Sequence, residues 1–320
     1  MDQGFDKGIF YGYLIKGDVM DAIEYLSRFP EQSALHQKYV SVFEKEEYPV
    51  GEADQSFHEI LLIYQKYYRD VFYLRMDADL AAEAMRSRLI RLFHLSNPDL
   101  PLSDIEQNHI AAVFQNKSYH FLGGKTGGYW GPYIWKTTES KTYDVELPDG
   151  RQPYPIRFLD GFIAKSWLDS ISFGEVSTGG WTDGDGIIHC VKASYDLEDE
   201  SFTVSLLKHE AQHAMDLSRY PQMSSEDLEY RAKLVELIYS RKRNLLQQFV
   251  HEADATNERN GHSMAANRIA EEFAKKLRID SSQFHTLAIS EIQAVSKELF
   301  ASSNDAVKLK YAKASSIISS

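Results

Sequence analysis

The residues best suited to chemistry lie in one short run, His209-Glu210-Ala211-Gln212-His213. In a helix, two histidines four positions apart project from the same face, one turn above the other, and can hold one metal ion. Glu210 is displaced to the side, where its carboxylate can meet a water bound to that metal. Two neutral imidazoles, an open position and a nearby carboxylate are the parts of a zinc hydrolase. The spacing predicts a Zn²⁺ site with His209 and His213 as ligands and Glu210 as the general base.

The surrounding sequence supports a buried helix for this run. Apolar residues lie on most sides of the segment from about Phe202 to Leu217, which is typical of a helix within a core. Asp199 or Ser201 can cap its start, and Pro221 prevents it from continuing far beyond its last turn. We expect one continuous helix over 202–217.

Two histidines do not complete a catalytic zinc site, and the residues alone leave the third ligand open. A second helix is predicted from about Glu226 to Arg241, with Ser224 at its cap. Glu229 lies in its second turn, and Glu236 lies two turns further along on a similar face. Asp216, three residues after the second histidine, is better suited to a hydrogen bond with an imidazole than to the metal.

The segment from about Val204 to Ile238 resembles the gluzincins, the thermolysin-like branch of zinc metallopeptidases with the His-Glu-x-x-His motif. The resemblance implies that Glu229 is the third ligand and that Ala232, three positions later, lets the two helices approach. It also implies a zincin-like catalytic core. Some relatives support a histidine with an aspartate where this chain has Lys233. Relatives place a His, Tyr or Arg beside the reacting carbonyl, which makes His262 a catalytic candidate; a solvent-facing helix cap is the alternative for this residue.

Composition narrows the classes of partner and compartment. The formal net charge is −12 and no block of Lys and Arg offsets it, so nucleic acid and anionic membranes are not expected partners. The single cysteine, Cys190, excludes an internal disulfide framework and fits a reducing compartment, and we interpret it as a small buried hydrophobe. The N-terminal segment lacks the apolar core of a signal peptide, and no stretch has the length of a membrane span. We expect a cytoplasmic protein; the sequence does not indicate an oligomeric state.

Three regions follow from the residue patterns along the chain. Residues 1–115 are predicted to form a helical N-terminal region, with helices at about 18–29, 32–43, 57–72, 77–93 and 103–114. Residues 116–198 are rich in glycine and aromatic residues and are expected to supply the β-structure of the catalytic domain. Residues 199–320 are predicted to be helical and to carry the motif and the third ligand. The expected fold class is α+β and mainly helical, with a small β-sheet.

Two strand predictions bear on substrate binding. Segments 141–147 and 155–159 flank Pro148-Asp149-Gly150 and predict a hairpin whose prolines keep the second strand at a sheet edge. The segment Ile187 to Ala193 is also predicted to be a strand. Directly before the motif helix, it could offer its edge to an extended peptide; a plain core strand is the equal alternative.

These patterns favour a zinc-dependent metallopeptidase acting on a peptide or protein substrate. The second hypothesis is a non-catalytic binding or regulatory protein that retains zinc for structure, with four protein ligands and no accessible water. A third hypothesis keeps the zinc chemistry but applies it to an amide bond outside a peptide.

Overall fold

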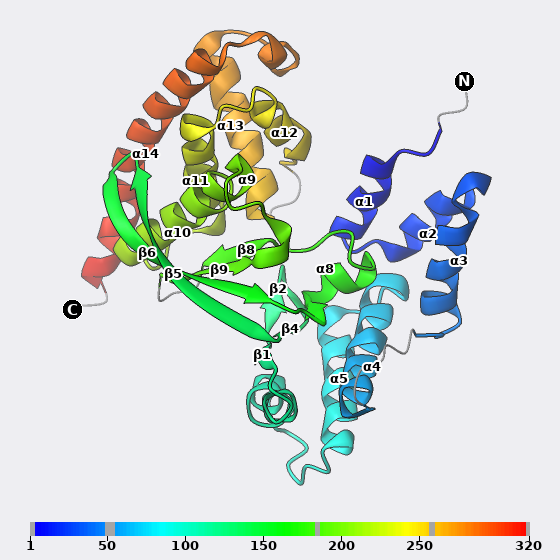
Figure 1. Ribbon diagram of the computed structural model, residues 1–320. Helices are drawn as coiled ribbons and strands as arrows, with labels where there is room; N and C mark the ends of the chain where they lie inside the picture. The colour runs from blue at the N-terminus through cyan, green and yellow to red at the C-terminus, as the bar shows by residue number, and fades with distance from the viewer. Residues whose placement is uncertain (1–3, 49–54, 183–185, 256–259, 318–320) are drawn as a thin grey trace. The chain divides into compact units, whose positions relative to one another are not determined.

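The computed structural model describes residues 4–48, 55–182, 186–255 and 260–317 (Figure 1). The prediction of a mixed, mainly helical fold with small sheets is confirmed. The chain forms two compact units, one comprising residues 1–137 with 160–178 and the other residues 138–159 with 179–320. This division follows spatial contacts, whereas the three predicted regions follow composition along the chain. Within the described ranges, no helix has the length and apolar character needed to cross a membrane.

The first unit begins with helices, as its periodic apolar residues predict. They are α1 (Lys7–Ile15), α2 (Val19–Ser27), α3 (Ser33–Tyr39), α4 (Gln55–Tyr68), α5 (Ala78–Leu92), α6 (Leu102–Ile105) and α7 (Ala111–Gln115). Three π-helical turns, at 40–44, 69–73 and 106–110, continue α3, α4 and α6. Aromatic side chains dominate the core that these helices share, and Phe10, Tyr39, Tyr64 and Phe114 are almost completely buried in it.

The remaining part of the first unit is a small β-structure with one helix. Strands β1 (His120–Leu122), β4 (Tyr133–Trp135) and β7 (Ala164–Lys165) form an antiparallel sheet, and β2 (Lys125–Thr126) pairs with β3 (Tyr129–Trp130). Helix α8 (Ser166–Ile171) follows β7 directly.

The second unit contains a four-stranded sheet in the order β5-β6-β9-β8. The hairpin is β5 (Thr137–Leu147) and β6 (Gly150–Asp160), β9 is Ile188–Val191, and β8 is Gly180–Thr182. The predicted edge position of the second hairpin strand is wrong, since β6 lies between β5 and β9 and pairs in parallel with β9. Its prolines are tolerated because Pro153 and Pro155 precede the residues paired with β9, which begin at Ile156.

The strand before the motif helix is also interior. β9 pairs with β6 on one side and with β8 on the other, so the prediction that this strand offers its own edge is wrong and the core-strand alternative is correct. All four of its residues are buried. Cys190 is among them, and burial raises the pKa of its thiol to about 12, as expected of a small core residue rather than a nucleophile.

A run of α-helices follows the sheet in the second unit (Figure 1). They are α9 (Glu200–Thr203), α10 (Leu207–Arg219), α11 (Ser225–Tyr239), α12 (Leu245–Glu252), α13 (Gly261–Leu277) and α14 (Ile289–Ile317). The continuous helix expected over 202–217 is interrupted between Thr203 and Leu207. Two consecutive β-branched residues, Thr203 and Val204, stand at the break, where such residues lower helix propensity. Asp199 caps α9 by accepting a hydrogen bond from the backbone N–H of Ser201.

Candidate metal centre

The two motif histidines lie on one face of α10 and meet a carboxylate from α11. Nε2 of His209 lies 3.0 Å from Nε2 of His213. The carboxylate of Glu229 spans both rings, with Oε2 3.3 Å from Nε2 of His209 and Oε1 3.4 Å from Nε2 of His213. All three residues are buried, and together they form a group able to hold a metal ion. The structure therefore brings together the three residues expected to be ligands.

The spacing of these atoms suits a small tetrahedral ion. Zinc bonds to imidazole nitrogen and carboxylate oxygen are about 2.0–2.2 Å long, so two ligand atoms of a tetrahedron lie about 3.3–3.5 Å apart. The two Nε2 atoms lie 3.0 Å apart, and they lie 3.3 and 3.4 Å from the two different oxygens of Glu229. Oε2 of Glu229 is buried without a hydrogen bond of regular geometry, which leaves a lone pair for an ion. The donor set, two nitrogens and one oxygen, is one that zinc accepts.

Helix α11 presents Glu229 because its start and its packing are both specified locally. The hydroxyl of Ser224 caps the helix by accepting a hydrogen bond from the backbone N–H of Asp227, as the sequence predicted. Glu229 follows in the second turn. Ala232, one turn later, is completely buried, and α10 and α11 pack against each other.

Glu236 supports the first histidine from the opposite side of the ring. Its Oε1 lies 2.7 Å from Nδ1 of His209, and both side chains are buried. An ionised carboxylate only accepts hydrogen bonds, so Nδ1 carries the proton and Nε2 of the neutral ring keeps its lone pair for a metal. The sequence left Glu236 open as a ligand, whereas the structure places it as the partner that orients His209.

Asp216 does not contact an imidazole, so the hydrogen bond expected for it is wrong. Its Oδ2 accepts hydrogen bonds from Nε of Arg231 at 2.8 Å and from Nε2 of Gln212 at 2.9 Å. Both Asp216 and Arg231 are buried. Arg231 lies on α11 and forms this pair across the packed helices, which removes Asp216 from the metal-binding group.

His262 also approaches the cluster. Its Nδ1 lies 2.9 Å from Oε2 of Glu229, and its ring lies roughly parallel to that of His209 with centroids 6.3 Å apart. The approach depends on Gly261, where a Cβ would lie 2.2 Å from Oγ of Ser225 and 3.0 Å from its backbone carbon. The His262 side chain is 54% exposed, so it borders both the cluster and solvent. Asn260, not His262, caps α13.

The electrostatics of the cluster are strongly coupled. Burial disfavours the charged form of His209, but contacts with Glu229 and Glu236 outweigh it and hold the pKa of the imidazole well above its ordinary value. Burial alone raises the pKa of the Glu229 carboxyl, whereas His209, His213 and His262 lower it far below its usual range. Without a metal, the contacts in the cluster therefore favour a proton on His209 and keep the carboxylate of Glu229 ionised.

Glu210 follows His209 on α10 and is partly exposed, unlike the three clustered residues. Its backbone carbonyl accepts a hydrogen bond of 3.1 Å from Oγ1 of Thr182, which ties the first turn of α10 to β8. β8 lies close to this helix start because Gly180 has no side chain; a Cβ there would lie 2.5 Å from Cδ1 of Leu206. Thr182 and Gly180 carried no motif by which the sequence could have identified them.

Comparisons with protein-family models, with curated proteins and with solved structures found no match for this chain.

Proposed function

We propose that the protein is a zinc-dependent metallopeptidase of the His-Glu-x-x-His class, with a zincin-like core similar to that of the gluzincins. The observation that carries the proposal is the convergence of two imidazole nitrogens and one carboxylate at 3.0, 3.3 and 3.4 Å. Three protein ligands leave one position of a tetrahedral ion for water, which distinguishes a catalytic site from a structural one.

Each residue of the cluster would have a distinct role. His209, His213 and Glu229 would hold Zn²⁺, and Glu236 would fix the orientation and tautomer of His209. When bound, the ion would polarise the scissile carbonyl and lower the pKa of a water ligand. Glu210 would accept the proton of this water and deliver it to the leaving amine.

His262 is the residue that separates the proposed enzyme from a structural zinc protein. His262 borders both the cluster and solvent, and in the enzyme its imidazole would donate a hydrogen bond to a developing oxyanion. If instead it were a fourth ligand, the ion would be enclosed by protein and the open position would be lost. A zinc-loaded protein with four protein ligands would therefore favour the binding or regulatory hypothesis.

The proposed substrate is a peptide or protein, and the proposed compartment is the cytoplasm. The acidic composition and a single buried cysteine support these assignments.

The test compares the natural protein with Glu210→Gln, both loaded with one equivalent of zinc, on a peptide library read by mass spectrometry. Loss of a general base lowers the rate by about 10²- to 10⁴-fold, so cleavage by Glu210→Gln is expected to fall by this factor while zinc content is unchanged. Cleavage at the natural rate by Glu210→Gln would refute the assigned mechanism. No cleavage by the zinc-loaded natural protein, over a library covering all residue types, would refute the peptidase.

A further inference from the structure

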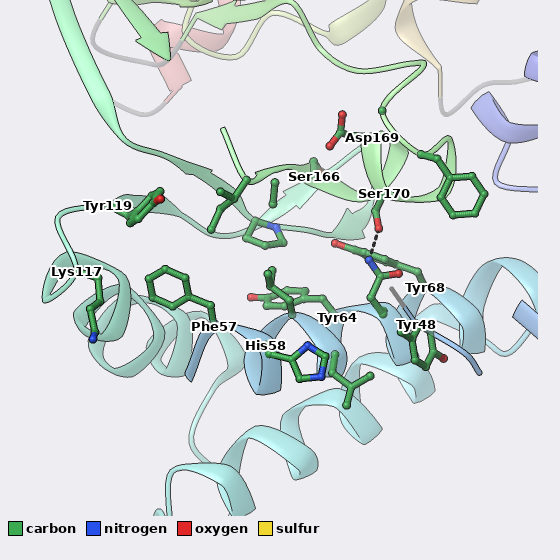
Figure 2. Close-up of a pocket in the computed structure, with 18 residues that line it drawn as sticks. Tyr48, Phe57, His58, Tyr64, Tyr68, Lys117, Tyr119, Ser166, Asp169 and Ser170 are labelled. Carbon is green, nitrogen blue, oxygen red and sulfur yellow. Dashed lines mark hydrogen bonds between the residues drawn. The ribbon is translucent and has the colours of Figure 1, made fainter. Parts of the chain in front are cut away.

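The first unit contains a cavity of about 890 Å³ that the proposed metal chemistry does not use. α4 forms one wall, and β7 with α8 forms the other (Figure 2). The volume is that of a pocket for a drug-sized organic molecule. Six aromatic side chains line it: Tyr48, Phe57, Tyr64, Tyr68, Tyr119 and Phe173.

Two of these rings are held in fixed orientations by contacts behind the cavity wall. The hydroxyl of Tyr64 donates a hydrogen bond of 2.5 Å to the buried carboxylate of Glu106, which also accepts one of 2.8 Å from the backbone N–H of Gly124. Phe57 packs against Phe114 with ring centroids 4.3 Å apart. Because these contacts are made within the protein, the rings are oriented before any ligand arrives, and little ordering is needed on binding.

Polar groups lie among the rings and are incompletely used by the protein. Nε2 of Gln65 donates a hydrogen bond of 2.6 Å to Oγ of Ser170, which joins α4 to α8 across the cavity (Figure 2). Oγ of Ser166 and the hydroxyl of Tyr48 are buried and have no hydrogen-bond partner in the described structure. Ser166 as a whole is only 3% exposed. A buried hydroxyl without a protein partner is costly to the fold unless a ligand or a water supplies one.

The backbone beside these groups is strained. Ser166 (φ 67°) and Phe173 (φ 54°) both adopt left-handed conformations that residues with a Cβ rarely take. Ser166 is the first residue of α8, and Phe173 lies two residues after its end. Both residues line the cavity. Strain of this kind persists where the surrounding structure enforces it and is concentrated at ligand-binding sites.

The charges around the cavity restrict the kind of ligand. Asp169 lines it, but its Oδ1 is paired with Nζ of Lys165 at 3.1 Å. Lys117 lies apart from Asp169, at the other end of the cavity (Figure 2). Fixed charges are therefore few and balanced, which does not favour a nucleoside triphosphate or another polyanion.

We propose that this cavity binds a planar aromatic organic molecule, uncharged or singly charged, whose edge carries an N–H or O–H group. Its rings pack between the aromatic side chains of α4 and those around α8, and its polar edge pairs with Ser166. Packing of the ligand rings against the aromatic side chains supplies most of the affinity. The hydrogen bond to the buried hydroxyl fixes the orientation of the ligand. The proposal is independent of the metal centre and is tested by binding alone.

The probe is 1-anilinonaphthalene-8-sulfonate, which has a planar naphthalene ring system, is singly charged and carries one N–H. It is titrated into the full-length protein with direct excitation of the dye, and stoichiometry is checked by calorimetry. We expect saturable binding of one dye per chain. Ile163→Trp, at a partly exposed position lining the cavity, should weaken binding at least about tenfold by occupying part of its volume. Leu80→Trp, on the exposed face of α5 and outside the cavity, is the matched control and should bind as the natural protein does.

Ser166→Ala separates a binding role from a structural one. Removing a hydroxyl that has no partner should leave the thermal midpoint unchanged or raised, whereas dye binding should weaken by about two- to tenfold, the worth of one hydrogen bond. Absence of saturable binding to the natural protein, or equal affinity in Ile163→Trp, would overturn the proposed site. Unchanged affinity in Ser166→Ala would overturn its hydrogen-bonding edge. Circular dichroism on every variant establishes that each comparison is made between folded proteins.

Discussion

The contact between Glu236 and His209 offers a graded test of how the metal centre is assembled. The 2.7 Å separation of Oε1 from Nδ1 and the burial of both side chains indicate a charge-assisted hydrogen bond. Such a bond contributes about 1.5–3 kcal/mol, which converts to about a 10- to 140-fold change in zinc affinity if the ring loses its orientation. Glu236→Ala should weaken zinc binding by this factor.

Glu236→Gln keeps an acceptor at the same position but removes its charge. A neutral hydrogen bond contributes about 1 kcal/mol less, so the expected loss is about fivefold and the order of affinities is natural protein, Glu236→Gln, Glu236→Ala. Glu226→Ala and Glu226→Gln are matched controls, because Glu226 lies in the exposed first turn of the same helix. Their affinities should equal that of the natural protein.

The assay is competition for zinc with a chromogenic chelator near neutral pH, accompanied by thermal unfolding of each variant without metal. The reasoning would be refuted if Glu236→Ala, folded as judged by its unfolding transition, bound zinc within threefold of the natural protein. It would also be refuted if Glu226→Ala lost as much affinity as Glu236→Ala, since the effect would then belong to the helix and not to the histidine.

Two further outcomes follow from the same structure. The pKa of His209 is raised in the folded protein, so its contribution to stability is complete below about pH 6.5 and is lost as the pH rises through the pKa of the folded state. The pKa of Glu229 is lowered, so its contribution to stability is lost as the pH falls below about 4.5. Zinc requires neutral imidazoles, so calorimetry should show the gap in unfolding temperature between zinc-loaded and chelator-treated protein widening from pH 5.5 to pH 8; a constant gap would contradict this. Asp216→Ala should destabilise the protein by about 3–5 kcal/mol in denaturant unfolding, because it removes the buried carboxylate nearest the guanidinium of Arg231, at 2.8 Å, and leaves only Asp149 at 3.7 Å. Asp216→Leu combined with Arg231→Met should recover much of the loss; equal destabilisation by both would contradict the ion-pair explanation.

The motif and its two helices can be predicted from the sequence because the features that specify them are local. The spacing of His209 and His213 fixes their common face once a helix forms, and Ser224 marks where the next helix begins. The helix break near Val204 does not follow from the apolar content of 202–217, which favours one continuous helix. It reflects the lower helix propensity of the two β-branched residues within this segment.

The side-chain contacts within the site are harder to predict from the sequence, because they depend on how two helices pack. The contacts of His209 with Glu236 and of Asp216 with Arg231 show that α10 and α11 run antiparallel, so residues later on α11 lie opposite residues earlier on α10. Glu236 therefore reaches the far nitrogen of His209. The sequence indicates the helical face on which Glu236 lies, but not which nitrogen of His209 it contacts. The internal positions of β6 and β9 were hidden for the same reason, since pairing of distant strands leaves no local signal.

Zinc stoichiometry of the Glu229→Gln variant tests the central claim most directly. The natural protein, Glu226→Gln and Glu229→Gln are each loaded with excess zinc, desalted and analysed by plasma mass spectrometry. Glu229 contacts both motif histidines, so its replacement removes the only carboxylate of the three-residue cluster. We predict one zinc per chain for the first two proteins and almost none for Glu229→Gln. A full equivalent of zinc on Glu229→Gln, or no zinc on the natural protein, would contradict the proposed metal centre.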